Sequence, residues 1–323
     1  MHNIPINHPI TRSPNHQISG SRVRPLLKWA GGKRQLLPQL RRFYPEAFGR
    51  YIEPFFGSGA VFFDLCASGR LRGHAAILTD ANPDLIGCYE AVRDAPAAVA
   101  DTLDMLAESH ARDERTHYYA VRDERFNPLR DERRTADGGI AYTPELAAMF
   151  IYLNRTGFNG LFRVNGRGAF NVPLGRYDRP HICDRGKLSR VSEALGAPGV
   201  QLARRSFEAA VEIAADGDFL YFDPPYAPVS HSSNFTSYTA TGFSADDQRQ
   251  LHQLVIAAAL RGCHVLLSNS TAADVVALYD TKAARDARLR AHVVPARRAV
   301  NSNAARRGPI NELLVTNVVN AAG

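Results

Sequence analysis

Four consecutive residues, Asp223-Pro224-Pro225-Tyr226, carry the chemistry that this sequence indicates most directly. They follow the apolar run 219–222, which has the composition of a strand buried in a parallel sheet, and open α/β folds bind ligands at the carboxyl ends of such strands. Two prolines make a stiff turn that presents a carboxylate, a carbonyl oxygen and an aromatic ring. Asp223 and the Pro224 carbonyl can accept hydrogen bonds from an amino group while Tyr226 stacks on its ring, as enzymes do with a base flipped out of a duplex. The alternative is that the prolines only end a strand and that Tyr226 packs in the core.

A glycine-rich turn between a short strand and the apolar stretch 61–66 is a second candidate site. Its residues are Tyr51, Ile52, Glu53, Pro54, Phe55, Phe56, Gly57, Ser58, Gly59 and Ala60. Glycines let a ligand approach the backbone in nucleotide-binding βα units, although the full dinucleotide fingerprint is absent and an ordinary strand-to-helix turn would explain the pattern about as well. The next strand, 75–79, ends in Asp80, about twenty residues after the glycines, where an acid commonly binds ribose hydroxyls. This spacing favours an adenosine-containing cofactor.

Trp29, the only tryptophan of the chain, is the third candidate. It lies between Lys28 and Lys33 and precedes the pair Gly31-Gly32, which could admit a ligand to the backbone. A tryptophan that anchors the N-terminal segment would give the same pattern. The two other motifs in the same chain favour a cofactor role.

The chain resembles the bacterial DNA adenine methyltransferase (Dam) family from about Arg24 to Val319. Six blocks occur in the family's order, which is far more specific than any single block. The blocks are Leu27 to Lys33, Glu53 to Gly59, Asp80 to Ile86, Leu153 to Arg163, Phe170 to Tyr177 and Asp223 to Pro228.

This resemblance implies a site-specific enzyme that transfers the methyl group of S-adenosylmethionine to the exocyclic amine of a flipped adenine, in duplex DNA and within GATC. The implied cofactor-binding residues are Trp29, Lys33, Glu53, Pro54, Phe55, Gly57, Ser58, Gly59, Asp80 and Asp223. The resemblance further implies guanine reading by Lys28 and Arg163, with Phe158, Asn159, Leu161 and Pro173 at the recognition surface.

Two positions depart from the family pattern. Thr156 stands where the family often has an aromatic residue, and Phe158 stands where it has a tyrosine. Phe158 keeps the apolar ring needed to wedge between base pairs but lacks the hydroxyl, so the change bears on the identity of the recognition sequence.

Basic charge is concentrated in two segments, as contact with nucleic-acid phosphates requires. The net charge is +7; residues 151–190 hold eight Lys or Arg against two acids, and residues 281–310 hold eight against one. In the first segment arginines alternate with aromatic residues and turn residues, a composition suited to a DNA-binding loop module. Arg176 and Arg179 follow this module and are candidates for phosphate contacts.

The order of elements predicts a Rossmann-like α/β methyltransferase sheet interrupted by a helical DNA-recognition insertion. We expect a disordered tail at 1–22, a catalytic domain from 23–93 and 191–323, and a target-recognition insertion at 94–190. The four cysteines have neither zinc-type nor disulfide spacing, and no apolar stretch approaches transmembrane length. These features indicate a cytoplasmic protein that associates with the nucleoid through DNA, without a metal.

Methyl transfer to an amine requires the protein to orient and polarise rather than to supply a nucleophile. Hydrogen bonds to Asp223 and the Pro224 carbonyl would stabilise positive charge as it develops on the adenine nitrogen. Methylation of cytosine N4 or of RNA adenine is the alternative reaction. A cofactor-binding DNA regulator without turnover is the alternative class of protein, and loss of Asp223 or Tyr226 would mark it.

Overall fold

The computed structural model describes residues 23–29, 31–226, 243–297 and 309–319. The expected tail at 1–22, the loop through Phe235 and Tyr238, and the polar loop Asn301 to Gly308 lie outside the described residues.

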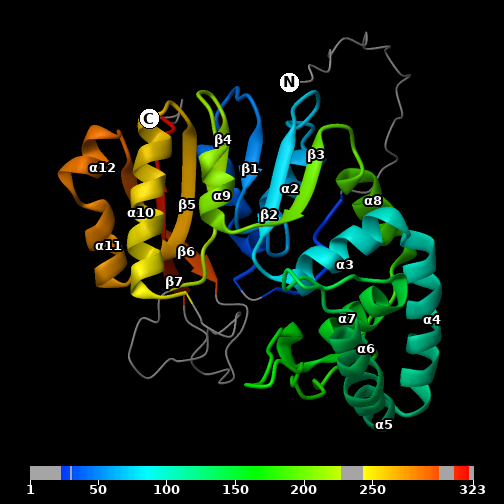
Figure 1. The fold of residues 1–323 in the computed structure, drawn as a ribbon. Coiled ribbons are helices and arrows are strands. Elements are labelled where there is room, and N and C mark those ends of the chain that lie inside the picture. The colour runs from blue at the N-terminus through cyan, green and yellow to red at the C-terminus, as the bar shows by residue number, and fades with distance from the viewer. Residues whose placement is uncertain (1–22, 30, 227–242, 298–308, 320–323) are drawn as a thin grey trace.

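A seven-stranded sheet forms the centre of the protein, with the order β3-β2-β1-β4-β5-β7-β6 (Figure 1). The strands are β1 (Tyr51–Glu53), β2 (Ala76–Asp80), β3 (Val200–Arg204), β4 (Phe219–Phe222), β5 (His264–Ser270), β6 (Arg290–Arg297) and β7 (Pro309–Thr316). The first five strands run parallel, and β7 is antiparallel to both β5 and β6. This mixed sheet, flanked by helices, confirms the predicted α/β fold class.

Helices cover both faces of the sheet. Because side chains alternate between the faces along each strand, a central strand contributes to the buried cluster on each face. In β4, Phe219 and Tyr221 join one buried cluster, with side chains from α2 (Ala60–Ala67) and α3 (Pro83–Asp94). Leu220 and Phe222 join the other, with side chains from α10 (Ala245–Leu260). Burial on both faces explains why this strand is apolar throughout.

The remaining helices are short near the N-terminus, and the longest of them, α4 and α7, follow β2. They are η1 (Lys33–Gln35), α1 (Leu37–Leu40), η2 (Arg41–Phe43), α4 (Pro96–Arg112), α5 (Glu114–Tyr119), η3 (Ala120–Phe126), α6 (Asn127–Glu132), α7 (Pro144–Thr156), η4 (Phe158–Gly160), α8 (Arg185–Leu195), α9 (Phe207–Glu212), α11 (Ala273–Tyr279) and α12 (Lys282–Asp286). Within the described residues, none of the helices combines the length and apolar character needed to cross a membrane.

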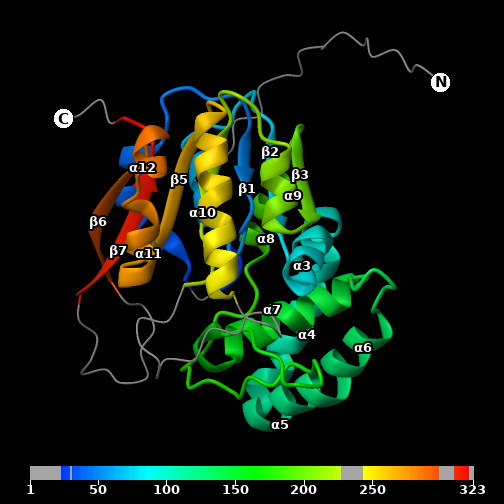
Figure 2. The same ribbon diagram turned by 60° about the vertical axis from the view of Figure 1, so that its left-hand side comes forward.

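The helices α4 to α7 form a group of their own below the sheet (Figures 1 and 2). They lie in the chain between β2 and the edge strand β3, and α8 leads from them back to β3. Inserting a segment before an edge strand leaves the ladder between β2, β1, β4 and β5 uninterrupted. Helices fill most of residues 96–156, as a helical insertion requires, and η3 adds a π-helical stretch that was not predicted.

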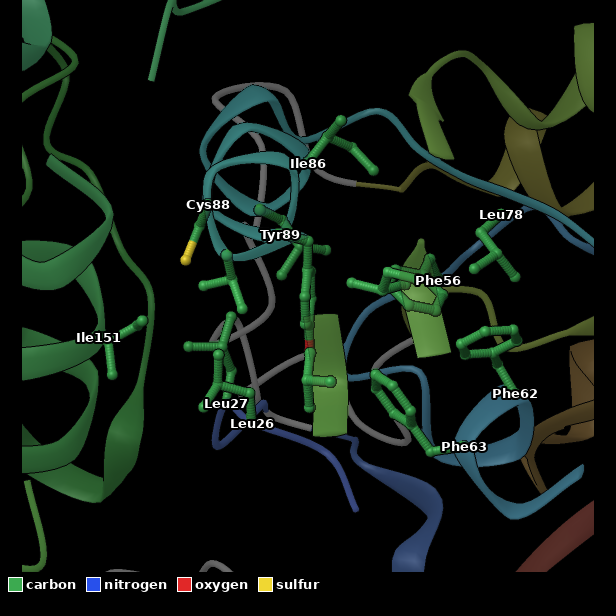
Figure 3. Close-up of a cluster of buried hydrophobic side chains, with 14 of the residues drawn as sticks. Leu26, Leu27, Phe56, Phe62, Phe63, Leu78, Ile86, Cys88, Tyr89 and Ile151 are labelled. Carbon is green, nitrogen blue, oxygen red and sulfur yellow. The ribbon is translucent and has the colours of Figure 1, made fainter. Parts of the chain in front are cut away.

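The N-terminal segment is tied to the group of helices through the hydrophobic core. Leu26 and Leu27 are almost completely buried. They lie between Tyr89 of α3 and Ile151 of α7, and the ring of Phe56 lies on the other side of Tyr89 (Figure 3). This cluster therefore joins the N-terminal segment, the glycine-rich turn and α7.

A buried ion pair links α3 to the group of helices. Arg130 of α6 donates from Nε and Nη2 to the two carboxylate oxygens of Asp84 at 2.6 and 2.7 Å, and from Nη1 to the carbonyl of Gly168 at 2.6 Å. Tyr142 also donates to Asp84, at 2.9 Å. The side chains of Asp84 and Arg130 are only 1% and 6% exposed. One arginine thus connects the start of α3 with the loop near residue 168.

Replacing Arg130 by alanine should lower the free energy of unfolding by about 3–5 kcal/mol, because Asp84 would keep a buried charge without its bidentate partner. Arg125→Ala is the matched control, since it removes an ion pair with Glu145 in which both side chains are exposed. That control should cost at most about 1 kcal/mol. Urea unfolding measures both variants, and equal losses would contradict the structural role of the Arg130 pair.

Candidate active site

A cavity opens at the carboxyl ends of β1, β2 and β4. Its volume of about 430 Å³ is usual for a small-molecule site. Glu53 ends β1, Asp80 ends β2 and Asp223 directly follows β4. The lining residues are Trp29, Gly31, Gly32, Lys33, Glu53, Pro54, Phe55, Phe56, Gly57, Ser58, Ala60, Asp80, Ala81, Asn82, Ser206, Phe207, Glu208, Tyr221, Asp223, Pro224, Pro225, Tyr226, Phe243 and Asp247.

Asp80 fixes the glycine-rich turn to the neighbouring strand. Its Oδ2 accepts from the Gly57 amide at 3.0 Å, and its Oδ1 accepts from the Asn82 amide at 2.9 Å. Burial raises the pKa of Asp80 to about 6, and these backbone amides oppose the rise. Gly57 has a φ of 48°, and a Cβ atom there would lie 3.2 Å from the Trp29 ring. The turn therefore lies close against Trp29 and needs glycine.

Lys33 and Asp223 form an ion pair in the wall of the cavity. Lys33 Nζ lies 2.8 Å from Asp223 Oδ1, and the Lys33 side chain is 3% exposed. Ser268 of β5 donates to the same oxygen at 3.2 Å. Burial raises the pKa of Asp223 to about 6, while Lys33 acts in the opposite direction. At neutral pH Asp223 is therefore ionised and its carboxylate is held in one orientation.

Tyr226 is held at its ring face and at its hydroxyl. Lys33 Nζ lies 4.4 Å from the ring centroid. The Tyr226 hydroxyl donates to Oε2 of Glu312, on β7, at 2.7 Å. The preceding residue is also fixed, since Gln248 of α10 donates to the Pro225 carbonyl at 3.3 Å. The turn after β4 is thus supported by the N-terminal segment, α10 and β7.

The cavity carries an excess of acidic side chains. Among its described lining residues, five are acidic and Lys33 alone is basic. Glu53 accepts from the Tyr51 hydroxyl at 2.9 Å, and burial raises the pKa of this acid well above its usual range. A ligand with a positive charge would relieve the cost of burying these carboxylates, whereas a phosphate group would add to it.

Aromatic side chains form the apolar wall of the cavity. Phe55 stacks on Phe207 with 5.3 Å between ring centroids, and Phe243 meets Phe55 edge-on at 5.8 Å. Trp29 stacks on Phe162 at 5.9 Å. A wall of this kind suits a planar heterocycle, and the carboxylates suit hydroxyl groups and a cation. The residues therefore fit an adenosine that carries a positively charged sulfonium group.

The predicted recognition residues gather in a second group. The Lys28 side chain packs on Gly160, where a Cβ atom would lie 2.5 Å from it. Lys28 Nζ donates to the Arg155 carbonyl at 3.3 Å and lies 4.0 Å from the centroid of the Tyr177 ring. Asn154 accepts from the Lys28 amide at 2.8 Å. The N-terminal motif and the loop after α7 are therefore one structural unit.

The loop after α7 presents Phe158 and Arg163 on the surface. Phe158 is 40% exposed, and its amide donates to the carbonyl of Pro173 at 2.9 Å. The exposed Arg163 donates from Nε to Asn171 Oδ1 at 2.8 Å and from Nη2 to the Asn171 carbonyl at 3.3 Å. These contacts fix the plane of the guanidinium group. Asn159, directly after Phe158, has a left-handed backbone with a φ of 55°.

The structure groups the predicted residues as follows. Every predicted catalytic and cofactor-binding residue lines the cavity except Gly59, which lies behind the turn against Phe56. None of the predicted DNA-binding residues is part of that lining. Leu161 is half-buried beside Lys28's partner Gly160, and Arg176 and Arg179 are exposed on the following segment.

Sequence reasoning missed several residues of the site, chiefly Phe207, Phe243, Ser268 and Glu312. Phe207 follows the edge strand β3 at the same end of the sheet, so its position carried a signal. Glu312 carried a weaker one, as an acid within the apolar run of β7. The described residues contain no group of three His, Cys, Asp or Glu side chains that could hold a metal ion.

Comparison with known proteins gives a consistent result over most of the chain. Residues 29–299 match the family described as D12 class N6 adenine-specific DNA methyltransferase. The Type II methyltransferase M1.LlaDCHI of Lactococcus lactis subsp. cremoris is 39% identical over 92% of this chain and 96% of its own length. M.MjaIII of Methanocaldococcus jannaschii is 38% identical over 78% of this chain and 86% of its own, and the DNA adenine methylase of Escherichia coli K12 is 35% identical over 90% and 94%.

Gly59→Ala tests the packing behind the glycine-rich turn. Gly59 has a φ of 66°, and a Cβ atom would lie 2.6 Å from the Phe56 ring, whereas Gly73 has a φ of 79° and nothing within 4 Å. Gly73→Ala is therefore the control, and in both variants the alanine suffers left-handed backbone strain of about 1–2 kcal/mol. Gly59→Ala should lose about 1–3 kcal/mol more in chemical denaturation, because a buried ring must move. Equal losses would show that the turn tolerates a side chain there.

Proposed function

Because the chain belongs to the D12 class of N6 adenine-specific DNA methyltransferases, we propose that it methylates an adenine flipped out of duplex DNA, with S-adenosylmethionine as the methyl donor. The family establishes an enzyme that acts on adenine in DNA. The cofactor, the flipping of the base and the recognition sequence GATC form the finer proposal.

One observation carries this proposal: an acid-rich, aromatic cavity lies directly beside the Asp223–Tyr226 turn. In the proposed complex, Trp29, Phe55 and the rest of the aromatic wall hold the adenine of the cofactor, and Asp80 binds its ribose. The glycine-rich turn, 53–59, borders the same ligand, with Gly59 supporting the turn from behind. The acidic lining favours a sulfonium compound over a phosphate-bearing nucleotide.

When bound, S-adenosylmethionine supplies an electrophilic methyl group, so the protein's task is to orient the adenine amine and to stabilise its developing charge. Lys33 and Ser268 both contact Oδ1 of Asp223. This leaves Oδ2 as the oxygen that accepts from the amine, together with the Pro224 carbonyl. The negative charge of Asp223 stabilises the positive charge on the nitrogen, and the surplus proton then leaves to solvent.

Tyr226 fixes the plane of the flipped base by stacking, and its hydrogen bond to Glu312 keeps its own ring in place. Phe158 fills the space that the base leaves in the duplex, because its exposed apolar ring can insert between base pairs. Phe158 lacks the hydroxyl of the family's tyrosine at this position, but insertion between base pairs uses only the apolar ring. Asn159, Leu161 and Pro173 lie beside it at the recognition surface.

Residues 94–190 act as the target-recognition insertion, and 23–93 with 191–323 form the catalytic domain. Arg163 is the main reader, since Asn171 holds its guanidinium plane and a planar fork can contact guanine O6 and N7 together. Lys28 reads a second guanine from the same unit. Arg176 and Arg179 contact phosphates.

The family argues against cytosine N4 or RNA adenine as the substrate, because its members are specific for adenine in DNA. A DNA-binding regulator without turnover is also disfavoured. Such a protein has no need for Asp223 and Tyr226, and both side chains line the cavity with their supporting contacts in place.

Expression in a methylation-null bacterial host tests the activity, the base and the site together. We expect N6-methyladenine at GATC sites in the host DNA and far less from the Asp223→Asn variant, in which the side chain keeps its size but loses its charge. Sequencing that reports modified bases provides the map. Methylated adenines in another sequence would contradict GATC alone, and methylated cytosine or unmodified DNA would contradict the proposed reaction.

The rate of methyl transfer should fall at acidic pH, because Asp223 must be ionised to accept from the amine. Its pKa of about 6 predicts that kcat, measured with saturating DNA and cofactor, decreases as the pH falls through about 6 and stays level above 7. A bound cation moves this step toward lower pH, and further burial of Asp223 beneath the bound base moves it toward higher pH. The Asp223→Asn variant should be slow and show no such step, and a step that survives in this variant would assign it to another group.

The Arg163→Ala and Arg179→Ala variants should lose activity on DNA in different ways. Loss of the base contact of Arg163 should cost about 1–3 kcal/mol at one base pair and relax specificity there. Loss of a phosphate contact at Arg179 should weaken all sequences alike and lower the salt slope by about one. Rates on GATC and on singly substituted sites, at two salt concentrations, measure the difference. A uniform loss in Arg163→Ala would show that Arg163 is not a reader.

A further inference from the structure

Glu312 is a carboxylate in the interior of the sheet. It lies in β7, where the following residues Leu313 and Leu314 are at most 1% exposed, and Glu312 itself is 9% exposed. Its backbone is paired on both sides, opposite Ser270 of β5 and opposite Val294 of β6. A carboxylate is costly at such a position unless it has a hydrogen-bond partner.

The partner of Glu312 is Tyr226, which comes from the other side of β5. The distance of 2.7 Å between the Tyr226 hydroxyl and Glu312 Oε2 is that of a strong, charge-assisted hydrogen bond. Burial raises the pKa of Tyr226 well above its usual value, and the nearby charges of Asp223 and Glu312 add to the rise. The phenol therefore stays neutral and remains the donor.

A tyrosine ring turns about two side-chain bonds. The hydroxyl oxygen lies on the axis of the second bond, so a contact there restricts the first bond, whereas a group over the ring face restricts the second. The two prolines before Tyr226 fix the backbone, Lys33 lies over the ring, and Glu312 holds its tip. Without the contact to Glu312, the ring could swing about its first side-chain bond and tilt relative to the Asp223 carboxylate. Stacking transmits such a tilt to any base that lies on the ring.

We propose that Glu312 is a positioning residue for methyl transfer: it fixes the position of the Tyr226 ring, and thereby the distance of the flipped adenine's amine from Asp223. This inference rests on the proposed function, in which Tyr226 stacks on the adenine. Glu312 does not touch the substrate, and its effect on the reaction passes through the tyrosine.

A double-mutant cycle isolates this role. Glu312→Ala and Tyr226→Phe each remove the hydrogen bond, and each should lower kcat about tenfold, since about 1.4 kcal/mol of lost orientation corresponds to that factor. The double variant should be no slower than the slower single variant. Glu312→Gln should remain within about threefold of the wild type, because its amide oxygen can still accept from the phenol.

The control is Tyr44→Phe, which removes another phenol that donates to a buried carboxylate, Asp64, at 3.3 Å and outside the cavity. This control should leave kcat unchanged. A purely structural role for Glu312 would lower stability without lowering the kcat of the folded enzyme. Thermal unfolding of each variant, and cofactor titration followed by the emission of Trp29, establish that folding and cofactor binding persist.

Duplex DNA with 2-aminopurine in place of the target adenine gives a second readout. Stacking on an aromatic ring quenches this base, so bound Glu312→Ala should give brighter emission than bound wild type, with Glu312→Gln in between or equal to wild type. Additive losses in the cycle, a Gln variant as slow as Ala, or normal kcat in Tyr226→Phe would each overturn the inference. If Glu312→Ala does not fold, the Gln and Phe variants still decide it. A wild-type enzyme that does not methylate adenine would refute the proposed function instead.

Discussion

The parallel ladder between β2, β1 and β4 is the constraint on which the cavity depends. Each of these strands ends in, or directly before, a carboxylate: Asp80, Glu53 and Asp223. Ile52 pairs with Ile77 on one side and with Leu220 on the other, and neighbouring strands lie about 4.8 Å apart. The carboxylates are therefore held close together although they repel one another. The buried apolar side chains on both faces of the sheet provide the stability that this repulsion requires.

Lys33 offsets part of the repulsion among these carboxylates and makes the distribution of charge in the cavity uneven. Its ammonium contacts Asp223, while the other two strand-end acids are satisfied by neutral donors, Asp80 by backbone amides and Glu53 by a tyrosine. Positive charge thus lies on one side of the cavity and uncompensated acid on the other. In the proposed complex, the cationic cofactor lies on the acidic side, and the adenine approaches from the side of Asp223 and Tyr226.

The sequence allowed the fold class and the strand-end residues to be predicted, because they depend on local patterns. An apolar run that stops at Asp223-Pro224 indicates both a buried strand and its end. The contacts of Glu312 and Arg130 could not be predicted, since they depend on the register of an antiparallel strand and on the approach of a helix far along the chain. Phe207 lies between these cases: it follows the end of a strand, which is a local feature, but its place at the cavity depends on the order of the strands.

The order of the strands has a consequence for how the protein is made. Arg50, just before β1, bonds to Asp218, just before β4, and the two are 168 residues apart in the sequence. A ribosome adding about 5–20 residues per second needs roughly 10–30 s to cover that interval. Until then one edge of β1 has no neighbour, and an unpaired edge invites aggregation. The contacts among α3, α4 and α7 involve only residues already synthesised by that time. The nascent chain can thus complete its helical part while the cavity still lacks one of its walls.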